Sequence, residues 1–374
     1  NSIVSGGDNN TAVGDEAGTA ITTGDSNAAL GQHALAANTT GTGNTASGKD
    51  ALDANTTGDY NVGLGYLALS SNTTADDNTA VGTSALTANT TGANNTAVGR
   101  KALLTNSTGT SNTAVGWSAL QDNTTGTDNT AVGVLALENT TTGANNTGMG
   151  RSALAANTTG NSNVAVGDTA LDANTTGSNN VAVGRYALTT STTGYSNVAV
   201  GYATAYSITT GFNNTAMGES ALNANTTGSS NVAVGQTSMY YNTTGTYNTA
   251  SGYRALFNNT TGSYNAAYGR LSLETNTTGN ENTAIGNAAL HLSTTGINNT
   301  SVGSASLGAN TTGSHNTSVG QSALPVSTTG QYNVANGYES LKANTTGNGN
   351  IGIGRQAGDI VTSGHYNIFV GPST

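Results

Sequence analysis

The chain has 374 residues, of which 34% are hydrophobic and 7% are charged, with a formal net charge of −10 and no cysteine. Its few Lys and Arg residues argue against a nucleic-acid partner, because binding to phosphates requires clustered positive charge, and the lack of cysteine excludes disulfides and thiolate chemistry. No stretch approaches the roughly 20 apolar residues that cross a membrane as a helix, so we expect no membrane insertion by this chain.

A glycine recurs every 17 residues from Gly7 to Gly364, and only Ala75 interrupts the series. If this glycine is position 0, each repeat reads G-x-x-N-[TV]-A-[VIS]-G-x-x-A-L-x-x-N-T-T, and residues 109–125 are a good copy. Position 3 is always Asn and position 7 is always Gly. A short fixed period that fills a chain is typical of a solenoid, in which each repeat forms one turn of a stack.

The first and last repeats depart from this pattern in the same way. Gly18 and Gly358 stand at position 11 in place of Leu, while Ile21 and Val361 stand at position 14 in place of Asn. End turns have a neighbour on one side only, so they need different side chains. We therefore expect one repeat domain over residues 1–374, with capping units at residues 1–24 and 348–374.

Within a repeat, positions 3 to 7 (N-T-A-V-G) predict a short strand, and positions 10 and 11 (A-L) a second apolar segment. The N-T-T-G run and the glycine at position 7 predict corners, because Asn and Gly tolerate positive φ. Half-turns of this length are too short for a stable helix. The sequence therefore predicts an all-β fold, a parallel β-solenoid (β-roll) of about 22 turns.

Stacking would bring each position of the repeat into a column along the solenoid. The invariant Asn of position 3 would then form a ladder of side-chain amides, and the invariant Gly of position 7 a column of corners. Representative members of the two columns are Asn10, Asn44, Asn112, Asn231, Asn367, Gly14, Gly48, Gly116, Gly235 and Gly371.

The nine basic and 19 acidic residues all fall at positions 1, 2, 8, 9, 12 and 13, so we expect these positions to face water. No charge occurs in the N-T-A-V-G strand, although an open sheet should carry charge at alternate positions. We therefore expect both faces of the strand to be covered. The larger residues of position 6, Tyr268 among them, would point inward, and the small Asn, Ala and Gly residues would pack against other copies in a homotrimer. The alternative is that the small residues line an uncharged exposed face.

The segment N-[TV]-A-[VI]-G-x-x-A, at residues 112–119 and 282–289, resembles the head repeats of YadA-type trimeric autotransporter adhesins and the repeat arrays of phage tail fibres. The N-T-T-G run departs from the adhesin repeat, so the resemblance covers about half of each 17-residue copy. It implies a left-handed parallel β-roll, three chains around a common axis, and attachment to surfaces from a cell or virion surface.

Candidates for enzymatic chemistry are weak. Asp76 and Asp77, or Asp50 with Asp53, lie at water-facing positions, and His33 and His291 are many turns apart. We expect no catalytic, metal or cofactor site. Exposed aromatic residues on a rigid surface suit a glycan or a protein receptor instead. The candidates for such binding are Trp117, Tyr206, Tyr240, Tyr241 and Phe257.

Taken together, these features predict a non-enzymatic extracellular fibre segment that gives reach and surface attachment, as in an adhesin head or a phage tail fibre. Three alternatives remain open. A filament or sheath protein would polymerise end to end, and a polysaccharide-cleaving tailspike would need two close carboxylates in a groove. An ice-binding solenoid would use ranked threonines, but the two residues of the recurring Thr-Thr pair point in opposite directions and leave a single column.

Overall fold

The structure is a computed structural model that describes residues 7–372. The chain forms two compact units: the N-terminal unit is Asn1–Arg185 with Ser191–Thr193, and the C-terminal unit is Tyr186–Thr190 with Gly194–Thr374. The described residues contain strands of three residues each, always at positions 4 to 6 of a repeat, and no helix. The prediction of an all-β parallel β-solenoid with a 17-residue turn is therefore confirmed, while the homotrimer stays a prediction.

The strands of the N-terminal unit are β1 (Thr11–Val13), β2 (Ala28–Leu30), β3 (Thr45–Ser47), β4 (Val62–Leu64), β5 (Thr79–Val81), β6 (Thr96–Val98), β7 (Thr113–Val115), β8 (Thr130–Val132), β9 (Thr147–Met149), β10 (Val164–Val166) and β11 (Val181–Val183). Those of the C-terminal unit are β12 (Val198–Val200), β13 (Thr215–Met217), β14 (Val232–Val234), β15 (Thr249–Ser251), β16 (Ala266–Tyr268), β17 (Thr283–Ile285), β18 (Thr300–Val302), β19 (Thr317–Val319), β20 (Val334–Asn336), β21 (Ile351–Ile353) and β22 (Ile368–Val370).

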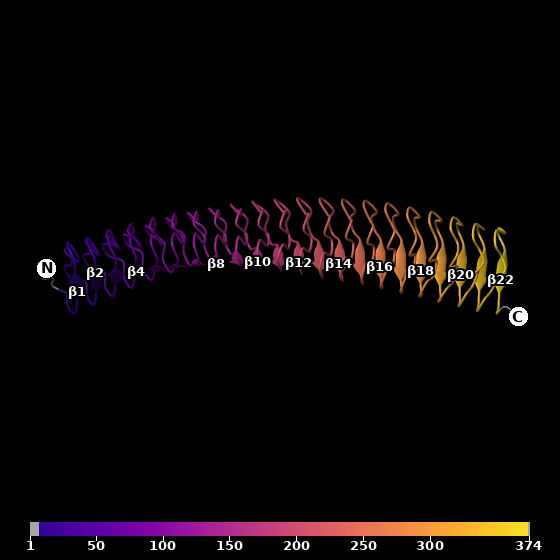
Figure 1. The fold of residues 1–374 in the computed structure, drawn as a ribbon, viewed down its shortest axis with the longest axis horizontal. Helices are drawn as coiled ribbons and strands as arrows, with labels where there is room; N and C mark the ends of the chain where they lie inside the picture. Colours follow the sequence, from indigo (N-terminus) through magenta and orange to yellow (C-terminus); the bar gives the residue numbers. More distant parts are fainter. Residues whose placement is uncertain (1–6, 373–374) are drawn as a thin grey trace. The chain divides into compact units, whose positions relative to one another are not determined.

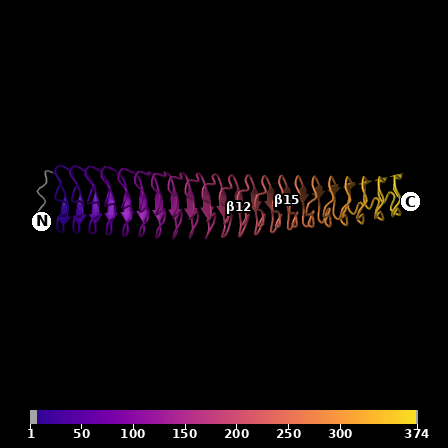
Figure 2. The ribbon, with the colours of Figure 1, turned by 90° about the horizontal axis from the view of Figure 1, so that it is seen from above.

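Each strand pairs in parallel with the equivalent strand of the next turn in its unit. In β7 and β8, for example, Ala114 lies opposite Ala131 and Val115 opposite Val132. Within each unit the ribbon winds as successive turns that carry their strands on one side (Figures 1 and 2). Because the pairing offset equals the repeat length, equivalent positions stack in columns.

The rest of each turn also bonds to its neighbours. The backbone N–H of Gly116 donates to the carbonyl of Val98 in the preceding turn at 2.8 Å, and that of Leu120 donates to Ala136 in the following turn at 2.9 Å. Two tight turns return the chain within one repeat: Ala119 N–H donates to Gly116, and Asn123 N–H to Leu120. Backbone N–H and C=O groups thereby find partners in the neighbouring turns, which is necessary because unpaired polar groups are costly to bury.

The core is a narrow column of Ala at positions 5 and 10 and Leu at position 11. Ala114, Ala119 and Leu120 are fully buried, although Leu120 has a φ of 52°. Leucine rarely adopts this left-handed backbone conformation. The Leu side chain is the largest buried group of each regular turn, and its burial offsets the cost of this backbone conformation.

Position 6 faces solvent, so the prediction that it points inward is wrong. Val115, Met149 and Tyr268 are 37%, 42% and 44% exposed, whereas position 5, mostly Ala, is buried in all the strands from β2 to β21. The reason is the thinness of the turn. A Cβ added at Gly148, itself at position 5, would lie 3.0 Å from the Ala153 carbonyl oxygen and 3.2 Å from a Leu137 side-chain carbon. Only a very small side chain fits inside, and larger ones must point out.

The described part of the C-terminal cap shows why its repeat carries Gly at position 11. A Cβ added at Gly358 would lie 2.5 Å from the ring of Phe369, which stands at position 5 of the last strand. Phe369 therefore occupies space that Leu fills in regular turns. In the first described repeat, a Cβ at Gly18 would lie 3.2 Å from the Ile21 side chain in the same way.

Candidate binding surfaces

The Asn of position 3 forms a hydrogen-bonded column inside each unit. The Asn112 Nδ2 donates to the Oδ1 of Asn95 at 3.2 Å and to the Gly126 carbonyl at 2.8 Å, while the Asn112 backbone N–H donates to the same Oδ1 at 3.0 Å. The Asn112 side chain and backbone thus donate to the preceding turn, and its amide also donates to the following one. Asn10, Asn44, Asn112, Asn231 and Asn367 all take part in such bonds. Their groups are used inside the fold and do not form a ligand site.

A second Asn column, at position 14, was missed by the sequence reasoning. Asn89 Nδ2 donates to Asn72 Oδ1 at 2.9 Å and to the Gly92 carbonyl at 2.9 Å, and both Asn side chains are fully buried. The signal was present, because Asn stands at this position in 14 of 21 repeats. We had assigned it to a corner instead. In these Asn-Thr-Thr triplets, the Asn side chain is therefore part of the interior, and the two Thr residues are more exposed.

The glycines of position 7 have backbones that other residues avoid. Gly14, Gly48, Gly116, Gly235 and Gly371 have φ values from 113° to 144°. A Cβ at Gly116 would lie 2.3 Å from the Gly133 carbonyl oxygen in the next turn. Turn-to-turn contact at this corner therefore requires glycine.

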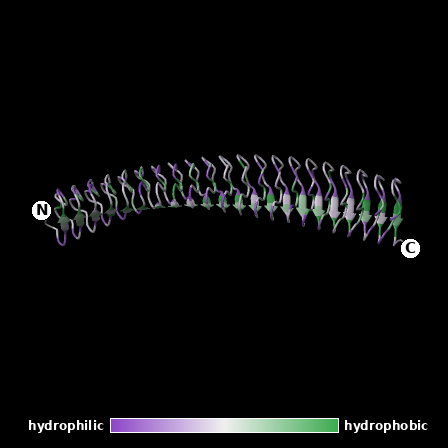
Figure 3. Cartoon of the chain, viewed as in Figure 1, coloured by the Kyte–Doolittle hydropathy of each residue, from purple (hydrophilic) through white to green (hydrophobic). Residues whose placement is uncertain are grey.

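The outer face of each sheet, made by positions 4 and 6 of the strands, carries no charged residue in either unit. Position 4 is mostly Thr or Val, and position 6 is mostly Val, with Leu, Ile, Met and Tyr268 in other turns and the polar residues Ser47, Ser251 and Asn336 in three of them. In Figure 3 the strands of the C-terminal unit are white to green, and most purple lies on the loops around them. We call this surface the sheet face. It is the charge-free strip that the sequence indicated, but on the opposite side of the strand from the small residues.

Aromatic residues gather in the C-terminal unit on two successive turns. Tyr241 meets Tyr240 and Phe257 edge-on, with ring centroids 4.7 and 5.1 Å apart, and Tyr240 stacks on Phe257 at 5.6 Å. The structure therefore brings three of the five candidate aromatic residues together. Tyr206 belongs to a different group, with Tyr186 6.5 Å away. Trp117 lies in the N-terminal unit at position 8 and is 45% exposed.

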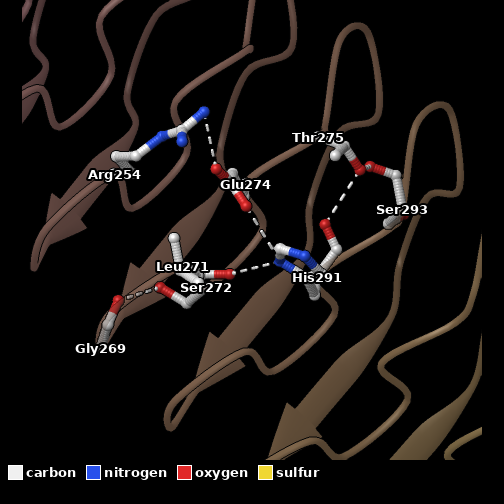
Figure 4. A network of polar contacts seen from close by, with 8 residues as sticks. All are labelled: Arg254, Gly269, Leu271, Ser272, Glu274, Thr275, His291 and Ser293. Atoms are coloured by element: carbon white, nitrogen blue, oxygen red, sulfur yellow. Dashed lines mark hydrogen bonds and ion pairs between the residues drawn. The ribbon is translucent and has the colours of Figure 1, made fainter.

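A polar network adjoins this aromatic cluster (Figure 4). Glu274 accepts from Arg254 at 2.9 Å and lies 3.2 Å from His291 Nδ1, and its side chain is largely buried. The Arg254 guanidinium also lies over the Phe257 ring at 4.1 Å from its centroid. Opposite charges at such short range and a cation on a ring face hold these side chains in place. Glu274 and His291 both stand at position 12 of successive repeats, so their adjacency follows from the period, whereas the contact of Arg254 at position 9 with Glu274 is not visible in the sequence.

Beside Tyr241 lies an open groove of about 550 Å³. One wall comes from position 13 of four successive turns, Ala224, Tyr241, Asn258 and Thr275. The other comes from position 15, Thr243, Thr260 and Thr277. Tyr241 is 47% exposed and is the only aromatic residue of the lining. The groove therefore combines one ring with hydroxyl and amide groups.

The acidic candidates are dispersed. Asp50 Oδ1 lies 2.8 Å from His33 Nδ1, and Glu16 lies 3.6 Å from the other ring nitrogen. Burial, with a further effect of Asp50, raises the pKa of Asp53. Hydrogen bonds from Gln356, Tyr338 and Lys342 lower the pKa of Glu339 to about 2. Across residues 7–372, no three His, Asp or Glu side chains converge in a group that could hold a metal ion.

In the part of the chain that the structure describes, no helix is long and apolar enough to span a membrane. Comparisons of the whole chain with protein-family models, curated proteins and solved structures found no match. What can be said of its function therefore depends on the sheet face, the aromatic cluster and the groove.

Proposed function

We propose that this chain is a non-enzymatic segment of an extracellular fibre, wound as a homotrimer, that provides reach and surface attachment. The observation that carries the proposal is the charge-free sheet face of each unit. All 28 charged residues of the sequence lie at other positions of the repeat, and the face exposes Val, Ile, Met and Tyr side chains instead. Long exposed apolar strips on soluble proteins mark interaction surfaces.

Another copy of the chain suits this face. Two copies share the same 17-residue period, so a strip of one matches the strip of another turn by turn. The chain also carries a net charge of −10, so a contact between copies is favoured where, as on the sheet face, no charged residue has to be brought close to another. The number of three copies follows from the resemblance to trimeric adhesin heads.

Light scattering coupled to size exclusion tests the proposal. We expect a mass near three times 36.8 kDa. A double variant, Val115→Glu with Val132→Glu, places two like charges on the sheet face and should lower the mass. The matched control is Trp117→Glu, at an exposed position where Glu219 occurs naturally in another repeat. A monomeric wild type, or equal masses for the double variant and the control, would overturn the proposal.

Ice binding is the second candidate, and one observation favours it. Strands β5 to β9 present Thr79, Thr96, Thr113, Thr130 and Thr147 in one unbroken rank on the sheet face, with a spacing of about 4.8 Å between strands. The Thr-Thr pair considered from the sequence is less suitable, because Thr124 Oγ1 donates to the Thr141 carbonyl. Thermal hysteresis of a monomeric wild type, lost in Thr113→Lys, would favour this candidate over the fibre.

A further inference from the structure

We propose that the groove beside Tyr241 binds a neutral glycan chain. This inference rests on the attachment role proposed above and names the class of ligand. Its walls follow positions 13 and 15 over four successive turns, and turns are about 4.8 Å apart, so the groove is about 15 Å long. That length accommodates an oligosaccharide lying along the solenoid.

Tyr241 supplies an apolar surface whose position is already fixed. Its ring makes edge contacts with Tyr240 and Phe257, which stack on one another, and Arg254 in turn lies over Phe257. The Tyr241 backbone N–H also donates to the Phe257 carbonyl at 3.0 Å. A ring held in this way loses little conformational entropy when a ligand packs on it. Aromatic rings provide large amphipathic contact surfaces of the kind that a sugar ring can cover.

The opposite wall supplies acceptors for hydroxyl groups. Thr243 Oγ1 donates to the Thr260 carbonyl at 2.9 Å, and Thr260 Oγ1 donates to the Thr277 carbonyl at 3.0 Å. Each of these hydroxyl groups has used its proton, so its remaining lone pairs are acceptors. The Asn258 side chain adds an amide to the lining. A polyhydroxylated ligand, which carries many O–H donors, complements this set.

The charges near the groove favour a neutral ligand. Glu274 pairs with Arg254, so the two opposite charges nearest the groove compensate one another. None of the lining residues is itself charged. A sulfated or carboxylated glycan would find no unpaired cation in this lining, whereas a neutral glycan would leave no buried charge unmatched.

Titration calorimetry on the full chain, with cellohexaose, mannohexaose and chitohexaose as probes, tests the inference. We expect weak binding of at least one probe and, for Tyr241→Ala, a loss of at least about five-fold in affinity because the ring surface is removed. Tyr241→Phe, which keeps the ring, should bind within about two-fold of wild type. The matched control is Tyr247→Ala, which removes an exposed ring stacked on Tyr264 outside the groove lining.

Binding of no probe would overturn the inference, as would equal losses in Tyr241→Ala and Tyr247→Ala. Stronger binding of an oligogalacturonate, an acidic glycan, than of every neutral probe would also contradict it. Light scattering on the same samples separates this result from the fibre proposal. A chain of trimeric mass that binds no hexasaccharide refutes only the glycan groove, and a monomer that binds one refutes only the self-association.

Discussion

The buried Oδ1 of Asn276 and the buried Oγ of Ser293 stand one turn apart at position 14, and neither has a hydrogen-bond partner within the described residues. In regular turns the side-chain amide of the next Asn supplies the missing donor. Asn276 Nδ2, for example, donates to Asn259 Oδ1 at 2.8 Å. The same pair of unsatisfied atoms recurs at Asn310 and Ser327. Serine is too short to continue the ladder, and each break leaves two buried polar atoms without a partner.

We therefore expect Ser293→Asn to stabilise the C-terminal unit. The new amide can donate to Asn276 Oδ1, and its oxygen can accept from the amide of Asn310. Because a buried hydrogen bond contributes about 1 kcal/mol, the gain should be about 1–2 kcal/mol. The midpoint of urea unfolding measures it. Thr295→Asn, at an exposed position of the same repeat, is the control, and an equal shift in both variants would contradict the ladder explanation.

Breaking the first ladder should have the opposite effect. Asn112→Ala removes two side-chain donations and leaves Asn95 Oδ1 with fewer donors. We expect the N-terminal unit to lose about 2–4 kcal/mol of unfolding free energy, because buried groups lose partners and a cavity remains. Hydrogen exchange should show the loss in the turns next to residue 112. Asn139→Ala, at an exposed position, should change little, and equal costs would show that burial in the ladder does not matter.

One repeat contains a matched pair of glycines. Gly303 has a φ of 132°, and its added Cβ would lie 2.5 Å from the Gly320 carbonyl oxygen, whereas Gly308 at position 12 has its nearest atom at 3.3 Å. Position 12 holds Ala in other repeats, for example Ala155. Gly303→Ala should cost more than about 2 kcal/mol, because strain and overlap add, and Gly308→Ala should cost less than about 0.5 kcal/mol. Thermal melts compare the two, and similar melting temperatures would refute the prediction.

The raised pKa of Asp53 predicts that its contribution to the stability of the fold becomes less favourable as the pH rises. Its pKa in the folded chain is raised above 3.8, mainly by burial and then by Asp50, so the folded state holds the proton more tightly than the unfolded state. The free-energy cost of ionising Asp53 in the folded chain is absent at pH values below its unfolded pKa and fully present above its folded pKa. Asp53→Asn should therefore stabilise the chain by less than about 1 kcal/mol at about pH 7 and have no effect at about pH 3. Urea midpoints at the two pH values test this, and a gain at the lower pH alone would reverse the sign.

The lowered pKa of Glu339 predicts the opposite pH dependence of folding stability. Its pKa is lowered to about 2, first by the Gln356 amide and then by Tyr338 and Lys342. Stability from these bonds is present above the unfolded pKa of about 4.5 and lost as the pH falls through about 2. Glu339→Gln should lower the melting temperature at neutral pH, and the difference from wild type should shrink toward about pH 2. A difference that stays constant over that range would rule out the carboxylate as its source.

The sequence supported some inferences better than others. The 17-residue period gave the solenoid, and the strand was found at the N-T-A-V-G segment because local alternation and an invariant corner glycine both point to it. The direction of the side chains was wrong, since alternation defines two faces but does not say which is inside. Tyr268 illustrates this: its position on a strand was clear, but its exposure was not.

The candidate site depended on neighbours that the sequence does not display. Tyr240, Tyr241 and Phe257 are among the candidates that the sequence indicates, and residues one repeat apart must be adjacent when turns stack. The contact of Glu274 with His291 follows the same rule, because both stand at position 12 of successive repeats, but the ion pair of Glu274 with Arg254 does not. Arg254 stands at position 9 and Glu274 at position 12 of the next repeat, and only the path of the tight turns between them brings these positions together.

The sequence by itself determined the repeat, the all-β class, the strand positions and the columns, because a strict period forces identical segments into identical environments. The tertiary structure decided which face of the strand is buried, that the Asn columns of positions 3 and 14 both lie inside, and where a groove forms. Those outcomes depend on the thickness of the turn. A chain that returns within 17 residues leaves room for Ala, Asn and one Leu in its interior, so the larger side chains of the strand remain on the surface.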